Sequence, residues 1–154
     1  MNIQLIPMTN EMYHIFFKEF ENDIDIYFNK DDYCEYQYSK ETVEKYILRQ
    51  RNLNRICLAV IFENEIVGEV KIYNIESNKS AVFGIALKNS KYKNRGIGTI
   101  AEKLAIEYVF NVLKISELYA DSVVTNKRSQ HVLEKVGFKL IGESDNRKHY
   151  KISK

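Results

Sequence analysis

A glycine-containing segment in the second half of the chain has the residue types and spacing of an anion-binding loop. It reads Lys93-Asn94-Arg95-Gly96-Ile97-Gly98-Thr99 and lies between a short apolar run and a long amphipathic stretch. Two glycines let the backbone turn tightly and approach a ligand closely. A helix that begins here would add its unpaired N–H groups and the positive end of its dipole. We therefore expect a phosphate or pyrophosphate to bind at this loop.

A helix and a strand must hold the loop in place. Apolar residues at three- and four-residue spacings after the loop predict a helix with one face buried on a sheet. These residues are Ile97, Ile100, Ala101, Leu104, Ala105, Tyr108, Val109 and Val112. Before the loop, apolar runs at residues 56–62, 66–75 and 81–87 are joined by polar turns and predict an antiparallel meander.

The N-terminal part of the chain predicts one strand and two helices. The strand covers residues 2–6, Thr9 or Asn10 can cap the first helix, and Ser39 can cap the second. Spacing places four apolar residues of the first helix on one face. They are Met12, Ile15, Phe16 and Phe20.

The C-terminal part predicts a strand, a helix and two further strands. After a strand at 118–124, Asn126 or Thr125 can cap a helix that runs to Val136 and ends at Gly137. The last two strands cover residues 138–141 and 149–152. The predicted order is β-α-α-β-β-β-α-β-α-β-β.

Composition favours one domain without a membrane span or a metal site. The chain has 154 residues, 45% of them hydrophobic, which suits a single domain over residues 1–154. No run approaches the ~20 apolar residues of a transmembrane helix, and the N-terminus lacks the pattern of a secretory leader. We therefore expect a cytoplasmic protein. Cys34 and Cys57 have no metal-ligand spacing and are expected to be structural thiols.

Charge is unevenly distributed along the chain. Residues 1–50 hold 5 Lys/Arg and 10 Asp/Glu, whereas residues 51–154 hold 18 and 11. A net charge of +2 gives no strong case for nucleic acid. The basic part contains the glycine loop, as binding of a polyanionic cofactor would favour.

Two common phosphate-binding motifs do not fit the loop. A dinucleotide-binding fingerprint requires a parallel βαβ unit, but an antiparallel meander comes first. A Walker loop requires G-x-x-x-x-G-K-[ST], which is absent. On spacing alone, a glycine-rich connection that binds no ligand stays open as the alternative.

Two blocks of the sequence resemble the GNAT acetyltransferases. Lys93 to Gly98 is similar to the family signature Q/R-x-x-G-x-G/A, and Asn126 to Phe138 is similar to the family segment N-x-x-S/A…E-K-x-G-F. With the order of elements, the resemblance covers residues 56–142 well. The second block is most similar to the branch that contains the ribosomal-protein N-terminal acetyltransferases. The resemblance implies an α/β (α+β) GNAT fold, with a mixed, mostly antiparallel sheet of six to seven strands and about four helices.

The resemblance implies acetyl-CoA as the acetyl donor and no metal. The backbone of Arg95 to Thr99 would hold the pyrophosphate, with Lys91, Lys93 and Arg95 adding positive charge around it. Strand residues would pair with the pantetheine arm, Asn126 would hydrogen-bond it, and Ser129 would lie near the thiol. The strand residues concerned are Ala86, Leu87 and Lys88.

The proton-transfer groups are less well defined by the resemblance. At the position of the tyrosine with which the family protonates the thiolate, the chain has Leu133, so the role falls to Ser129, to a water or to a tyrosine such as Tyr150. Asp121, five residues before Asn126, is one candidate base, and Glu69 is its competitor. For both carboxylates, a solvated or lysine-paired strand residue is the alternative.

An acidic, aromatic segment is expected to contact the acceptor. Residues 19–36 hold seven Asp/Glu and one Lys, interleaved with five Phe or Tyr, in the region that lines the acceptor pocket in the family. Carboxylates beside aromatic faces suit a cationic amine. A solvated acidic loop is the alternative.

These observations predict acetyl transfer to a primary amine. The acceptor would be a peptide N-terminus or a small polyamine-like or aminoglycoside-like molecule, with no nucleic-acid or membrane partner. A catalytically silent acyl-CoA-binding module and a nucleotide-binding regulatory domain are the alternatives. Edge strands near the C-terminus would allow a homodimer.

Overall fold

One seven-stranded sheet carries all the helices. The computed structural model describes residues 1–154, and the strands lie in the order β1-β2-β3-β4-β5-β7-β6. The strands are β1 (Ile3–Pro7), β2 (Ile56–Phe62), β3 (Glu65–Glu76), β4 (Ser80–Leu87), β5 (Glu117–Val123), β6 (Lys139–Ser144) and β7 (Arg147–Ser153). The helices are α1 (Asn10–Lys18), α2 (Lys40–Asn52), α3 (Ile97–Glu107) and α4 (Lys127–Lys135). All neighbouring strands are antiparallel except β4 and β5, which are parallel.

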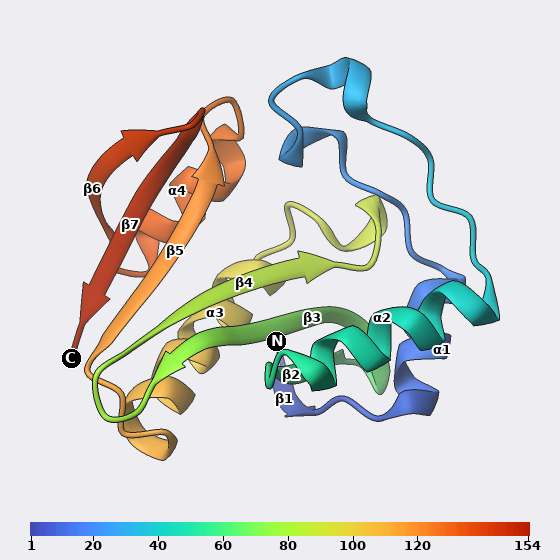
Figure 1. The fold of residues 1–154 in the computed structure, drawn as a ribbon, viewed down its shortest axis with the longest axis horizontal. Helices are drawn as coiled ribbons and strands as arrows, with labels where there is room; N and C mark the ends of the chain where they lie inside the picture. The colour runs from blue at the N-terminus through green and yellow to red at the C-terminus, as the bar shows by residue number, and fades with distance from the viewer.

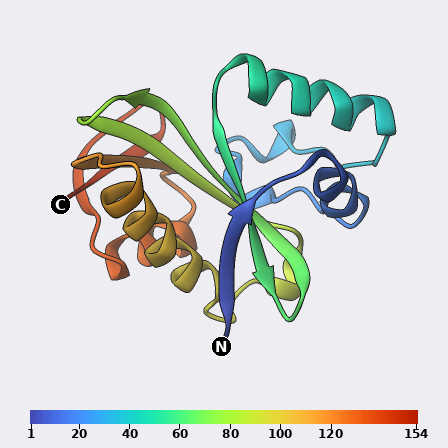
Figure 2. The same cartoon turned by 90° about the horizontal axis from the view of Figure 1, so that it is seen from below.

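The helices cover the two faces of the sheet in pairs. Helices α1 and α2 lie on one face and α3 and α4 on the other, as the two views show (Figures 1 and 2). The larger core joins the sheet to α3 and α4, while a smaller core around Phe16 and Val43 joins α1 to α2. No helix is long and apolar enough to cross a membrane.

The sheet opens between its two parallel strands. Only Ser80–Val82 of β4 pairs with Glu117–Tyr119 of β5, and the strands diverge beyond this point (Figure 1). From Phe83 to Leu87, the edge of β4 that faces β5 therefore has no strand partner. Residues 120–123 of β5 have a free edge opposite it, because β5 pairs with β7 on its other side.

The predicted elements are confirmed, with two differences in the helices. The helix after the glycine loop is α-helical only to Glu107, and Tyr108–Val112 forms a π-helical turn that leaves Val112 62% exposed. In α1 the buried face contains Tyr13 and Phe17 rather than Ile15, which is 44% exposed. The face is rotated because α1 packs against α2 and β3 through its aromatic side chains.

Candidate active site

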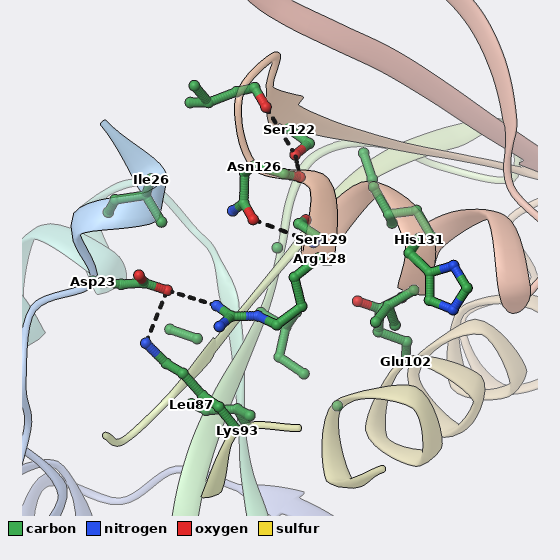
Figure 3. Close-up of a pocket in the computed structure, with 18 of the residues that line it drawn as sticks. Asp23, Ile26, Leu87, Lys93, Glu102, Ser122, Asn126, Arg128, Ser129 and His131 are labelled. Atoms are coloured by element: carbon green, nitrogen blue, oxygen red, sulfur yellow. Dashed lines mark hydrogen bonds and ion pairs between the residues drawn. The ribbon is translucent and has the colours of Figure 1, made fainter. Parts of the chain in front are cut away.

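A cavity of about 470 Å³ lies where β4 and β5 diverge. It is lined by β4, the glycine loop, the first turns of α3, the end of β5, the start of α4 and the segment from Phe20 to Ile26 (Figure 3). The volume falls within the range of small-molecule sites. The two sequence blocks that predicted the site therefore meet in one cavity.

The glycine loop presents an open helix N-terminus to this cavity. Side chains of Thr9, Ser39 and Asn126 cap α1, α2 and α4, but α3 begins at Gly96 without a side-chain cap. Gly96 has φ +82°, and a Cβ placed on Gly96 or Gly98 would touch nothing within 4 Å. The N–H groups at the start of α3 can therefore meet an anion at close range, so the loop fits a pyrophosphate.

The residues predicted in the loop divide into two groups. Five of them line the cavity, namely Lys93, Asn94, Gly96, Gly98 and Thr99.

Arg95 and Ile97 do not line the cavity with their side chains. The Arg95 guanidinium lies 5.3 Å from the centre of the Phe62 ring, and Ile97 is fully buried in the core. Their backbone N–H groups lie at the start of α3, where a ligand can meet them. The exposed Lys91 does not line the cavity either, and its ammonium lies over the Tyr92 ring.

The three residues predicted to pair with the pantetheine arm, Ala86, Leu87 and Lys88, do not all lie where the prediction placed them. Ala86 and Leu87 line the cavity. The Lys88 N–H donates to the Val67 carbonyl at 2.7 Å, its carbonyl accepts from the Glu21 N–H at 2.9 Å, and its buried ammonium lies 3.3 Å from Glu19. Both backbone groups of Lys88 are therefore already hydrogen-bonded within the protein, so Lys88 does not offer a ligand the free strand edge that was predicted.

The turn between β5 and α4 orients Asn126 and Ser129 toward the cavity. Asn126 Oδ1 accepts the Ser129 N–H at 3.2 Å, which leaves the Asn126 Nδ2 for another acceptor. Gln130 fixes the turn through bonds from its Nε2 to the carbonyls of Val123 and Val124. Leu133, which also lines the cavity, is 2% exposed.

Asp121 lines the cavity and is joined to two side chains that the sequence did not predict. His149 Nδ1 lies 2.5 Å from Asp121 Oδ1, and Ser144 Oγ lies 2.6 Å from His149 Nε2. Asp121 and His149 are direct partners across β5 and β7. Because Leu118 and Ala120 belong to the core under α3 and α4, Asp121 points to the opposite face of the sheet. The carboxylate fixes the orientation of the imidazole, and together they can hold a proton.

Glu69, the competing candidate base, does not line the cavity. It is 3% exposed, and its two carboxylate oxygens accept hydrogen bonds from Tyr13 and, at 2.7 Å, from Tyr46. Burial raises the pKa of Tyr46, and the Glu69 carboxylate raises it further. Glu69 therefore connects β3 to α1 and α2, and the structure does not bring it together with Asp121.

The acidic segment contributes an unpredicted ion-pair cluster at the cavity. Asp23 Oδ2 lies 3.0 Å from both Lys93 Nζ and Arg128 Nη2 (Figure 3). Asp25 Oδ2 lies 3.8 Å from Arg128 Nη1. Burial alone would raise the pKa of Asp23, but the hydrogen bond from the Asp25 N–H and the two cations lower it. The acidic run in the sequence does not indicate which of its carboxylates pairs with Lys93 and Arg128.

Glu102 of α3 is a second acidic residue at the cavity that the sequence analysis missed. It lines the cavity and is 3% exposed. Burial raises the pKa of its carboxyl to about 8. The helical pattern offered a signal, since Glu102 lies next to the apolar positions of α3.

Comparisons with known proteins agree with this arrangement. The family model described as an acetyltransferase (GNAT) domain matches residues 3–139. Spermidine N(1)-acetyltransferase of Escherichia coli is 33% identical over 82 residues, which is 53% of this chain and 44% of that protein. The match thus spans less than half the length of that relative.

Solved structures share the whole fold at low sequence identity. The N-acetyltransferase PseH of Campylobacter jejuni in complex with acetyl coenzyme A has a TM-score of 0.73 and 18% identity, with 99% of each chain covered. The ribosomal-protein-S5-alanine acetyltransferase of Vibrio fischeri has a TM-score of 0.72 and 18% identity, with coverage of 99% of this chain and 93% of that one.

Proposed function

Because the chain belongs to the GNAT acetyltransferase family, we propose that it transfers an acetyl group from acetyl-CoA to a primary amine. One observation carries the proposal. A single cavity contains an open helix N-terminus at the glycine loop and a histidine-linked carboxylate between diverging strands. The first feature suits a pyrophosphate and the second suits removal of a proton from an amine.

The chain offers a coherent set of groups for the cofactor. The N–H groups of Gly96 to Thr99 would hold the pyrophosphate, with Lys93 beside them. The free edge of β4 at Ala86 and Leu87 would pair with the pantetheine arm in the manner of an added strand. Asn126 Nδ2 would donate to the same arm. When bound, acetyl-CoA supplies a thioester that an amine can attack.

Asp121 is the proposed proton acceptor for the attacking amine. Its carboxylate lies at the cavity on the face away from α3 and α4, and His149 behind it can share the proton. Ser129 is the proposed donor toward the departing sulfur, since Leu133 has no proton to give. Tyr150 is a poorer candidate, because it is 1% exposed and its hydroxyl donates to Glu134 at 3.4 Å.

The proposed acceptor is a peptide N-terminus or a small cationic amine. The Escherichia coli relative carries the name of an enzyme that acts on spermidine, a cationic amine. Within the acidic segment Glu19 pairs with Lys88, and Asp23 and Asp25 contact Arg128, but the four other carboxylates form no ion pair. These four are exposed, do not line the cavity and would attract a cationic acceptor from outside it; they are Glu21, Asp31, Asp32 and Glu35.

Thiol release from acetyl-CoA tests the proposal. The protein is incubated with acetyl-CoA and a panel of amines that includes spermidine, an aminoglycoside and short peptides, and free CoA thiol is measured. We expect turnover with at least one amine. Tight CoA binding without turnover on any amine would favour a silent binding module. A rise in melting temperature with ATP or NAD but not with CoA would favour a nucleotide-binding domain.

A further inference from the structure

Glu102 holds the one buried side-chain polar atom in the protein that has no hydrogen-bond partner. That atom is Oε2, and the residue is 3% exposed on the side of α3 that faces the cavity. Figure 3 shows the carboxyl group between α3 and the first turns of α4, on the cavity side of His131. An unpaired buried carboxyl group is costly, so its presence calls for a physical explanation.

Nothing in the protein itself explains an acidic residue at this position. Its neighbours on the buried side of α3, Ala101, Ala105 and Ile106, are apolar, and no cation forms an ion pair with it. Burial alone raises the pKa of the Glu102 carboxyl to about 8. At pH 7 the group is therefore mostly protonated, with an O–H donor beside a C=O acceptor.

The position of Glu102 relative to the glycine loop indicates which part of a ligand it meets. Glu102 lies one turn of α3, a rise of roughly 5 Å, beyond Thr99 and the N–H groups proposed to hold the pyrophosphate. The free edge of β4 and the side chain of Ser129 line the same cavity. In acetyl-CoA, the part that follows the pyrophosphate is the pantetheine arm, whose main hydrogen-bonding groups are two amides.

We propose that the Glu102 carboxyl group binds acetyl-CoA by hydrogen-bonding an amide of the pantetheine arm. This inference rests on the proposed function. An amide offers one N–H and one C=O, which complement the C=O and O–H of a carboxylic acid. Glu102 would thus hold the arm from the α3 side, opposite the edge of β4. Its single unsatisfied oxygen would gain a partner only when the cofactor is bound.

The other charged groups at the cavity leave Glu102 without a partner, and several of them pair with one another. Lys93 contacts Asp23, and so does Arg128, while Asp121 contacts His149. None forms a hydrogen bond or ion pair with Glu102. The titratable side chains that line the cavity with Glu102 are Asp23, Lys93, Asp121, Arg128, His131, Lys135 and Arg147.

The test compares Glu102→Leu with Glu102→Gln, which keeps a donor and an acceptor. Affinities for CoA and for adenosine 3′,5′-bisphosphate, which lacks the arm, are measured by calorimetry at pH 7, and melting temperatures are measured without ligand. We expect Glu102→Leu to melt higher, to bind CoA about tenfold more weakly, and to bind the bisphosphate as the parent does. Glu102→Gln should bind CoA within about twofold of the parent.

A pH series adds a second readout. Above pH 8 the parent carboxyl ionises and loses its O–H donor, so CoA affinity should fall with rising pH in the parent but not in Glu102→Gln. Glu107→Leu, an exposed change on the same helix, is the matched control and should leave CoA affinity unchanged.

Two outcomes would overturn the inference. The first is that Glu102→Leu binds CoA as tightly as the parent, and the second is that it loses affinity for CoA and for the bisphosphate equally. If the parent protein itself fails to bind CoA, the proposed function fails with it. Parent binding with an unaffected Glu102→Leu would overturn the role of Glu102 alone.

Discussion

The two sides of the cavity are built by different means. On the α3 side, the binding groups are backbone N–H groups and glycines that lie within seven consecutive residues, Lys93 to Thr99. On the opposite face of the sheet, Asp121 and His149 come from strands that are distant in sequence and meet through the register of β5 with β7. The first side fits a phosphate or pyrophosphate, a chemical group that many ligands share. The second carries Asp121, the proposed proton acceptor, and its partner His149.

The largest effect is expected on the α3 side of the cavity, at Gly96 of the glycine loop. Gly96→Asp should weaken CoA binding by about a hundredfold or more, because it places a carboxylate at the start of α3, where an anion is expected. The φ of +82° also strains any side chain at this position, so the melting temperature should fall. Calorimetry with CoA and a thermal melt measure the two effects.

The matched control for this change is Gly142→Asp in β6, where a Cβ also meets nothing within 4 Å but φ is not positive. It should leave CoA affinity unchanged. Equal affinities of Gly96→Asp and the parent would contradict the assignment of the loop.

An intermediate effect is expected on the side of the cavity that holds Asp121 and His149. Asp121→Asn should lower kcat by about a hundredfold, because the proton acceptor is lost, while CoA affinity stays constant. Steady-state kinetics with the best amine, together with calorimetry, separates the two quantities. His149→Gln should lower kcat less, since Asp121 remains.

Glu69→Gln is the control for Asp121→Asn. It should lower the melting temperature, because Tyr13 and Tyr46 lose a charged acceptor, and it should change kcat little. Near-normal turnover in Asp121→Asn together with a large loss in Glu69→Gln would transfer the role of base to Glu69.

The smallest effect is expected at Asp23, which pairs with Lys93 of the glycine loop and with Arg128 of α4. Asp23→Asn should tighten CoA binding by about threefold, because Lys93 and Arg128 then no longer pair with a carboxylate and can face the phosphates. Affinity should also become more sensitive to salt. Asp31→Asn, which removes an exposed carboxylate without an ion-pair partner, serves as the control. Weaker binding in Asp23→Asn would show that Asp23 positions the two cations.

The contrast between the two sides explains which features could be predicted from the sequence. The glycine loop, the Asn126 cap and the strand runs are local patterns, and the structure places all of them as expected. Lys88 was misplaced because its sequence neighbours lie at the cavity, whereas its own backbone bonds involve Val67 and Glu21.

Contacts between distant segments carry no comparable signal. His149 reaches Asp121 through strand pairing over 28 positions, and Asp23 reaches Arg128 over 105 positions. Glu102 is an intermediate case. Its place beside apolar positions of α3 was visible in the sequence, but the pattern could not show that the space around its carboxyl group is a cavity.

The opening between β4 and β5 also limits what can pair with its two free strand edges. Two unpaired strand edges inside one sheet would normally invite an extra strand from another molecule. A β-strand needs a constant spacing of about 4.8 Å to each neighbour. Here the edges are paired at Val82 and Tyr119 and separate steadily beyond them, so no β-strand can pair with both along its length. An added β-strand could therefore pair with one edge only, whereas a thin, flexible chain can form a few hydrogen bonds with either edge.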